Sequence, residues 1–128
     1  MEPSDHPAQL NVFGAPIQDC CHSPKTGYFR SGLCETDETD HGSHTVCAQI
    51  TREFLEYSRK SGNDLSGPVP QTGFPGLVPG DKWCLCAARW LAALTAGSAP
   101  PVYLGSTHMR ALEVIDIKDL MAHAVDLN

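Results

Sequence analysis

Two thiols stand one residue apart in the segment GDKWCLCAARW, where Cys84 and Cys86 lie between the two tryptophans of the chain. Cysteine and histidine bind soft metal ions, and they also act as nucleophile and base in thiol chemistry. The chain has six cysteines and six histidines in 128 residues. The other cysteines precede this segment and are Cys20, Cys21, Cys34 and Cys47. The chemistry open to this chain therefore depends on whether the fold brings distant sulfur atoms together.

A metal- or small-ligand-binding domain is the leading hypothesis. Zinc sites usually take their ligands from cysteine pairs spaced C-x2–4-C on tight turns, and no pair in this chain has that spacing. A site would have to be assembled from remote segments. Thiolates select zinc or cuprous copper as the bound ion. The expected metal ligands are four thiols and one imidazole: Cys84, Cys86, Cys47, Cys34 and His44.

A thiol-dependent enzyme or redox protein is the first alternative. A reactive cysteine needs a cation, an imidazole or the amino end of a helix beside it. Cys86 directly precedes a predicted helix, and Arg89 or His108 can supply the positive charge or the imidazole. A second alternative makes the cysteines buried, reduced core residues, because free cysteine packs as a small hydrophobe. The chain would then serve as a protein-interaction module.

Polar residues near the thiols extend the candidate site to a small ligand. The residues expected to contact this ligand are Trp83, Arg89, His108 and Asp81. The Arg89 guanidinium would pair with an anionic group of the ligand. Three of these residues also have a purely structural explanation. Asp81 suits a turn or a helix cap, Trp83 suits the core, and Arg89 can pair with a buried carboxylate.

Composition and charge narrow the class of partner. The net charge is −6, and the nine basic residues are scattered, which disfavours nucleic acid and anionic membrane surfaces. The start of the chain, MEPSDHPAQL, lacks the features of a signal peptide, and no segment approaches the ~20 apolar residues of a membrane span. Motifs for nucleotide binding and for common hydrolases are missing from the sequence. We therefore expect a cytoplasmic protein whose cysteines stay reduced, with a small ligand, a metal or a protein as its partner.

Local patterns predict two strands and two well-bounded helices. Residues 44–50 alternate as a strand, with Val46, Ala48 and Ile50 on one face. A helix follows, capped by Thr51 and ended by Gly62. KWCLC is predicted as a strand that places both thiols on one face, and a helix follows from Ala87 to Gly97.

The remaining segments are rich in turns. Residues 63–80 hold four prolines and four glycines, so they are expected to form a long loop, held to the core by Phe74 and Leu77. Short strands are predicted at 27–33 and 102–105. Thr107 is expected to cap a short helix, and Asp116 to open the last one.

These elements predict an α+β fold, in one compact loop-rich domain with a few short strands and three to four helices. Residues 1–10 are expected to form a disordered tail and residues 11–128 the domain.

Several phrases of the chain are similar to successive blocks of a known family. They are TGYFRSGLC, GSHTVCA, GNDLS, FPGLVPGDKWCLCAARW and APPVYLGSTHMRAL, and together they resemble the small bacterial proteins grouped as domain of unknown function 2237. The likeness runs from about Asn11 to Asp126. It implies a single compact domain and brings no established activity. Cys21 is an addition to the family pattern, and many relatives have a second cysteine where this chain has Leu33.

Overall fold

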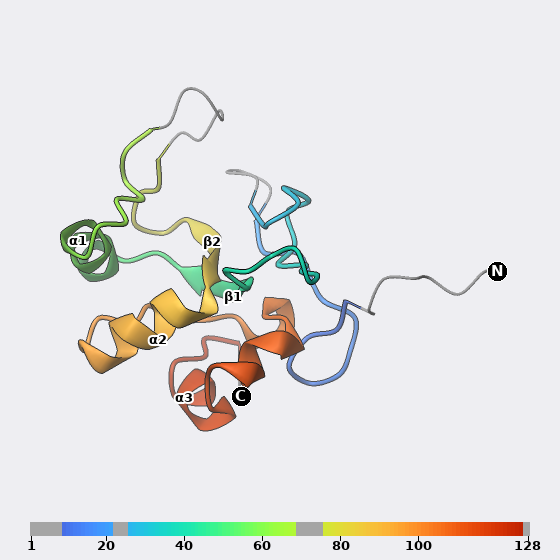
Figure 1. The fold of residues 1–128 in the computed structure, drawn as a ribbon. Helices are drawn as coiled ribbons and strands as arrows, with labels where there is room; N and C mark the ends of the chain where they lie inside the picture. The colour runs from blue at the N-terminus through green and yellow to red at the C-terminus, as the bar shows by residue number, and fades with distance from the viewer. Residues whose placement is uncertain (1–8, 22–25, 69–75, 127–128) are drawn as a thin grey trace.

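The fold is an α+β arrangement around a two-stranded antiparallel sheet (Figure 1). The structure is a computed structural model that describes residues 9–21, 26–68 and 76–126. The strands are β1 (His44–Gln49) and β2 (Lys82–Cys86). The helical elements are α1 (Arg52–Lys60), α2 (Ala87–Thr95), α3 (Ile117–Ala122) and two 3-10 turns, η1 (Leu104–Ser106) and η2 (Met109–Glu113).

Strand β1 separates two buried clusters because its side chains alternate between the faces of the sheet. Val46 and Ala48 belong to the main hydrophobic core, to which α1, α2 and α3 all contribute. Cys47 points to a smaller cluster made mostly of cysteines. Figure 1 shows α2 and α3 below the sheet, and the segments that precede β1 lie beside and above it. The predicted alternation along residues 44–50 is therefore confirmed.

Both predicted boundaries of α1, the helix that follows β1, are confirmed. Thr51 caps α1, and its hydroxyl accepts a 3.1 Å hydrogen bond from the Phe54 amide. The side-chain oxygen satisfies one of the amides that the first turn leaves unpaired. Beyond the last turn, Gly62 adopts a φ of 93°, a left-handed conformation that glycine takes without steric cost.

Strand β2 runs directly into helix α2. Cys86 is both the last residue of the strand and the N-cap of the helix, with φ −57° and ψ 129°. The predicted change from strand to helix at this residue is confirmed, and it places the Cys86 side chain at the amino end of α2. The Cys86 side chain makes no capping hydrogen bond to the helix.

Two predicted short strands are wrong. Residues 27–33 form turns and bends, because Gly27, Arg30 and Gly32 all have positive φ angles that no strand accommodates. In the segment 102–105, Val102 makes only isolated bridges, to Ala48 and Ala124, before the chain tightens into η1. The apolar residues of this segment fit the pattern of a strand, but only Val102 forms β-bridges with neighbouring segments.

Two further predictions concern the second half of the chain. Asp116 caps α3, as predicted, by accepting a 2.9 Å hydrogen bond from the Lys118 amide. The cap of the preceding turn is His108 instead of Thr107. The Thr107 hydroxyl donates to the Tyr103 carbonyl instead, and accepts from the Cys47 amide. Thr107 thus ties this segment to β1.

The long predicted loop is partly described. Leu77 is buried in the core, as predicted, and its amide donates to the Leu65 carbonyl across the loop. Phe74 lies outside the described residues, and so do residues 1–8 of the predicted tail. No helix in the described part of the chain is long and apolar enough to cross a membrane.

Candidate functional site

Cys86 and His44 face each other across the antiparallel ladder. They are direct partners in the register, and a bulge follows at once, because His44 pairs with Cys86 whereas Val46 pairs with Leu85. Directly opposed residues have Cβ atoms on the order of 5 Å apart, so their side chains can meet on the same face. Bulges re-aim side chains and are common next to functional sites. This one ends the regular pairing where Cys86 begins α2.

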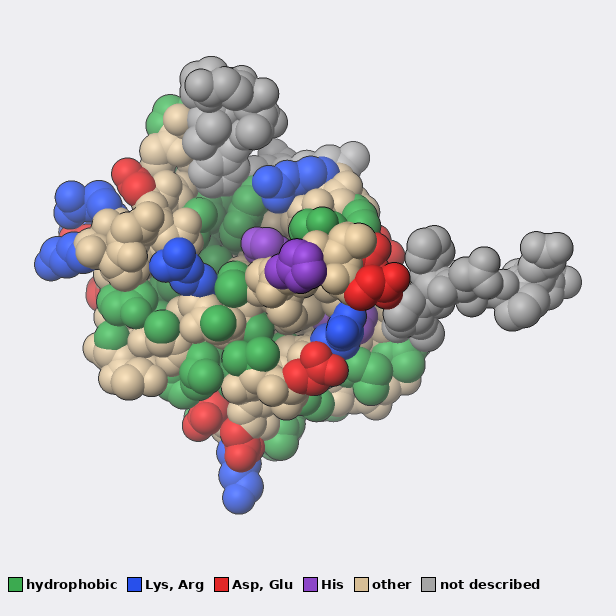
Figure 2. Space-filling view, in the orientation of Figure 1, with side chains coloured by type: hydrophobic (Ala, Val, Ile, Leu, Met, Phe, Trp, Pro, Cys, Tyr) green, Lys and Arg blue, Asp and Glu red, His purple; other side chains and the backbone are tan. Residues whose placement is uncertain are grey.

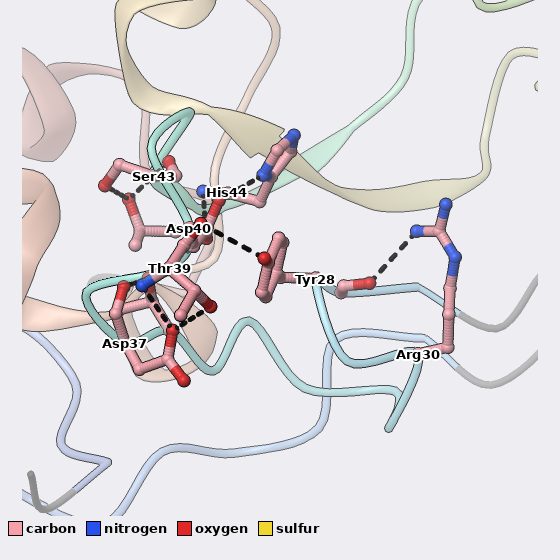
Figure 3. A network of polar contacts seen from close by, with 10 residues as sticks. Tyr28, Arg30, Asp37, Thr39, Asp40, Ser43 and His44 are labelled. Carbon is pink, nitrogen blue, oxygen red and sulfur yellow. Dashed lines mark hydrogen bonds and ion pairs between the residues drawn. The ribbon is translucent and has the colours of Figure 1, made fainter. Parts of the chain in front are cut away.

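A buried carboxylate holds the His44 ring. Asp40 Oδ1 lies 2.7 Å from His44 Nδ1, and the Asp40 side chain is fully buried. The other carboxylate oxygen accepts hydrogen bonds from the His44 amide at 2.9 Å and from the Thr36 hydroxyl at 3.0 Å. These bonds fix the carboxylate, and the carboxylate fixes the ring. Figure 3 shows the second ring nitrogen, Nε2, pointing away from Asp40.

Two neighbours restrict the imidazole further. The Tyr28 ring stacks on it, with centroids 6.1 Å apart and planes 19° from parallel (Figure 3). Gly42 leaves the space that the ring occupies, since a Cβ at that position would lie 2.8 Å from His44 Cε1. The ring is therefore constrained by its bond to Asp40 and by packing on both neighbours.

A pocket of about 530 Å³ lies over this pair. Figure 2 shows basic and histidine side chains close together near the middle of one face of the molecule, with hydrophobic atoms between them. The pocket draws on loops, on β2 and on the first turn of α2. It is lined by Arg30, His44, Asn63, Asp64, Leu65, Trp83, Cys84, Leu85, Cys86 and Arg89.

Two arginines give the pocket positive charge. The Arg30 guanidinium lies over the Trp83 ring, 5.2 Å from its centroid, and its Nη1 donates to the Gly27 carbonyl at 3.0 Å. Arg89 lies in the first turn of α2, whose amino end also attracts anions. The acid in the pocket, Asp64, is engaged by Ser66, whose amide and hydroxyl both donate to it. These bonds, that of the hydroxyl first, lower the pKa of Asp64.

A cysteine cluster consists of Cys20, Cys34, Cys47 and Cys84, the last of which also lines the pocket. They form two disulfides, Cys20–Cys47 and Cys34–Cys84. All four residues are buried. The expectation that the cysteines stay reduced is therefore wrong for four of the six. Composition led to that expectation, whereas pairing depends on which segments the fold places side by side.

The predicted metal ligands divide between these two places. Cys34, Cys47 and Cys84 lie in the cysteine cluster, where each is half of a disulfide. Cys86 carries a free thiol and lies with His44 in the pocket. The two thiols of KWCLC thus have different environments.

The predicted ligand contacts divide as well. Trp83 and Arg89 line the pocket. Asp81 lies in a turn, where its carboxylate accepts a hydrogen bond from the Val78 amide at 3.0 Å. His108 is buried next to β1, and its amide donates to the Thr45 carbonyl.

Comparison with models of known protein families shows which family the chain belongs to. The model of a family described as "Uncharacterized protein conserved in bacteria (DUF2237)" matches residues 10–124. The chain belongs to this family. The resemblance noted from the sequence blocks is thereby confirmed. A search of curated proteins found no match.

Two site residues of this DUF2237 protein, Asp40 and Arg30, were not predicted from the sequence. The spacing D-x-x-x-H was a usable signal for Asp40, since a tight turn at Gly42 can fold a carboxylate back onto the imidazole four residues later. Arg30 had no such signal. Its position depends on its positive φ of 55° and on contact with Trp83, which is 53 residues away in sequence.

His108 leads to a prediction about pH. Its Nδ1 accepts a hydrogen bond from the Arg110 amide, so the neutral ring carries its proton on Nε2, a buried atom with no hydrogen-bond partner among the described residues. Burial lowers the pKa of His108 from the ordinary value of 6.5, and the Arg110 charge acts in the same direction. Glu35 and Glu113 oppose this effect.

We expect the folded protein to lose stability as the pH falls below 6.5. The unfolded chain then binds a proton that folded His108 resists, and the loss continues until the pH reaches the lower folded pKa. Urea unfolding at several pH values between 7.5 and 5 measures this loss in the free energy of unfolding. His108→Asn keeps a capping acceptor without a titrating ring, so its free energy of unfolding should fall less over that range. Equal slopes for the two proteins would contradict the prediction.

Proposed function

We propose that the pocket binds a small anionic molecule and that Cys86 acts on it as a nucleophile, with His44 as the base. The observation that carries the proposal is the line of three residues in which buried Asp40 holds His44, and His44 is paired in register with free Cys86. A nucleophile, a base and a group that orients the base form the arrangement that thiol enzymes use.

Each side chain has a distinct role in this proposal. His44 Nε2 takes the proton from the Cys86 thiol, and the sulfur electron pair forms a bond to an electrophilic carbon of the substrate. The displaced group leaves with the proton that His44 returns. Asp40 keeps the ring in the tautomer with Nδ1–H and stabilises the imidazolium that forms.

The charge of the pocket supports an anionic substrate. Arg30 and Arg89 can both donate to a carboxylate or phosphate group, and guanidinium groups bind such groups through paired hydrogen bonds. The cavity volume of about 530 Å³ is within the range of small-molecule sites. Stacking on Trp83 leaves the Arg30 guanidinium oriented before a ligand arrives.

The rate of thiol alkylation tests the nucleophile and its base. Iodoacetamide reacts with thiolates, and the free cysteines are Cys86 and Cys21, so Cys21 serves as the internal control. At pH 6 we expect Cys86 to react at least about tenfold faster than Cys21, followed by peptide mass spectrometry. His44→Gln should remove most of that difference.

Two further variants probe how the ring is held. Asp40→Asn should lower the Cys86 rate because the amide supports neither the charge nor the tautomer of His44. Gly42→Ala should lower it as well, since the added Cβ displaces the ring. If Cys86 and Cys21 react at equal rates, or His44→Gln leaves the Cys86 rate unchanged, the proposal fails.

Metal binding, the other part of the hypothesis drawn from the sequence, involves a different place in the fold. His44 is engaged by Asp40 and paired with Cys86 in the pocket, whereas the sulfur atoms that converge belong to the cysteine cluster. A metal site there would be independent of the thiol chemistry proposed for Cys86.

A further inference from the structure

The cysteine cluster gathers four sulfur atoms from four segments of the chain. Cys47 and Cys84 are direct partners on β1 and β2, and each is bonded to a cysteine from a loop, Cys20 or Cys34. The sulfur atoms of Cys20, Cys34 and Cys47 all lie within 4.8 Å of one another, and that of Cys84 is bonded to Cys34. The two disulfides therefore lie side by side.

We propose that, when both disulfides are reduced, the four thiolates of the cysteine cluster hold one zinc ion. Zinc takes four thiolates in a tetrahedron with Zn–S distances of about 2.3 Å, which places the sulfur atoms about 3.8 Å apart. The Cys34 sulfur lies within 4.8 Å of those of Cys20 and Cys47, which is close to this spacing. Opening each disulfide by roughly 2 Å completes the tetrahedron.

Contacts other than the disulfides hold the two loops in place. The amides of Cys20 and Cys21 both donate to the Gly32 carbonyl, so the loop that carries Cys20 is bonded to the one that carries Cys34. The Thr26 hydroxyl accepts a hydrogen bond from the Cys84 amide at 2.8 Å, and the Ser106 hydroxyl donates to the Asp19 carbonyl. The four thiols are thus kept near one another after reduction.

Burial favours closed coordination of the metal. Cys34 and Cys47 have no exposed surface, Cys84 is 1% exposed and Cys20 is 4% exposed. Four protein ligands and no open position are the features of structural zinc sites. The strands supply two ligands from a rigid pair, so only the loop cysteines need to shift.

The conversion balances in two steps. Each disulfide accepts two electrons and two protons from two molecules of a small thiol, which leave as their own disulfide. Zinc then replaces the four thiol protons, which pass to solvent. A thiol oxidant that removes two electrons from each cysteine pair reverses the sequence and releases the zinc. The cluster would therefore alternate between two disulfides and one zinc ion according to the redox state around it.

Zinc binding by the full chain with Cys21→Ser and Cys86→Ser tests the proposal, because the four cluster cysteines are then the only thiols in the sequence. The protein is reduced with a phosphine, supplied with zinc chloride and desalted, and its zinc is measured by mass spectrometry. We expect about one zinc ion per chain, and a melting temperature of the reduced protein raised by on the order of 10 °C. Cobalt in place of zinc should give the intense visible absorption of a tetrahedral thiolate complex.

Two outcomes would overturn the proposal. One is less than about a tenth of an equivalent of bound zinc in the reduced chain, judged against the four ligands that a site needs. The other is unchanged zinc content after Cys34→Ser and Cys84→Ser are added. If that variant does not fold, the cobalt spectrum of the protein with the intact cluster still tests the site. An octahedral spectrum would exclude a site with four thiolate ligands. Because Cys86 is absent from the test protein, the result does not depend on the function proposed for the pocket.

Discussion

Replacing Cys34 and Cys84 together with Ala is expected to lower the free energy of unfolding by about 2–5 kcal/mol. The disulfide joins residues 50 positions apart and attaches an irregular segment to β2. Without it the unfolded chain gains the conformational freedom of a large loop, on the order of 4 kcal/mol in the chain-entropy model. Urea denaturation in metal-free buffer, followed by circular dichroism, measures the change.

The control for this experiment is Cys21→Ala. Cys21 is a partly exposed free thiol, and its replacement should change the free energy of unfolding by less than about 0.5 kcal/mol. If the double variant and the wild type unfold at the same urea concentration, with equal slopes, the disulfide does not stabilise the fold.

Replacing Trp90 with Ala is expected to cost about 3–5 kcal/mol. Trp90 has no exposed surface and is the largest fully buried side chain. Its indole N–H donates to the Pro100 carbonyl at 3.0 Å, and its ring meets His123 edge-on at 5.4 Å. Truncation leaves a cavity between α2 and the segment that leads to α3, and an unpaired carbonyl beside it. Urea unfolding followed by circular dichroism measures the loss.

Trp90→Phe separates packing from hydrogen bonding. The phenyl ring fills much of the space but offers no donor to Pro100, so we expect a loss of about 1–3 kcal/mol, smaller than that of the alanine variant. A loss below about 1 kcal/mol for Trp90→Ala would contradict the burial seen in the structure, because cavities of this size are always costly.

The elements predicted best from sequence are those whose signals are local. The cap at Thr51, the alternation along β1 and the change at Cys86 from strand to helix depend on residues within one or two turns of each other. The strand predictions at 27–33 and 102–105 are wrong for a related reason. A strand needs a partner along its length, and Val102 finds one only at isolated positions.

The site shows the same division. His44, Trp83, Cys86 and Arg89 were predicted from residue type, and the structure brings these four to one pocket. Asp40 and Arg30 were missed because one acts through a turn and the other through a contact between distant segments. A sequence with six cysteines likewise allows many disulfide pairings. The fold forms two of them, Cys20–Cys47 and Cys34–Cys84.

From the amino-acid order alone came the family, the α+β class and the two helices next to the strands, since periodicity and capping act over short stretches of chain. The tertiary structure decided that Cys84 is bonded to Cys34 in the cysteine cluster, whereas Cys86 keeps a free thiol beside His44 in the pocket. Cys84 and Cys86 are separated only by Leu85. The register of β1 against β2 sets their different partners, and it depends on contacts between segments that are far apart in the chain.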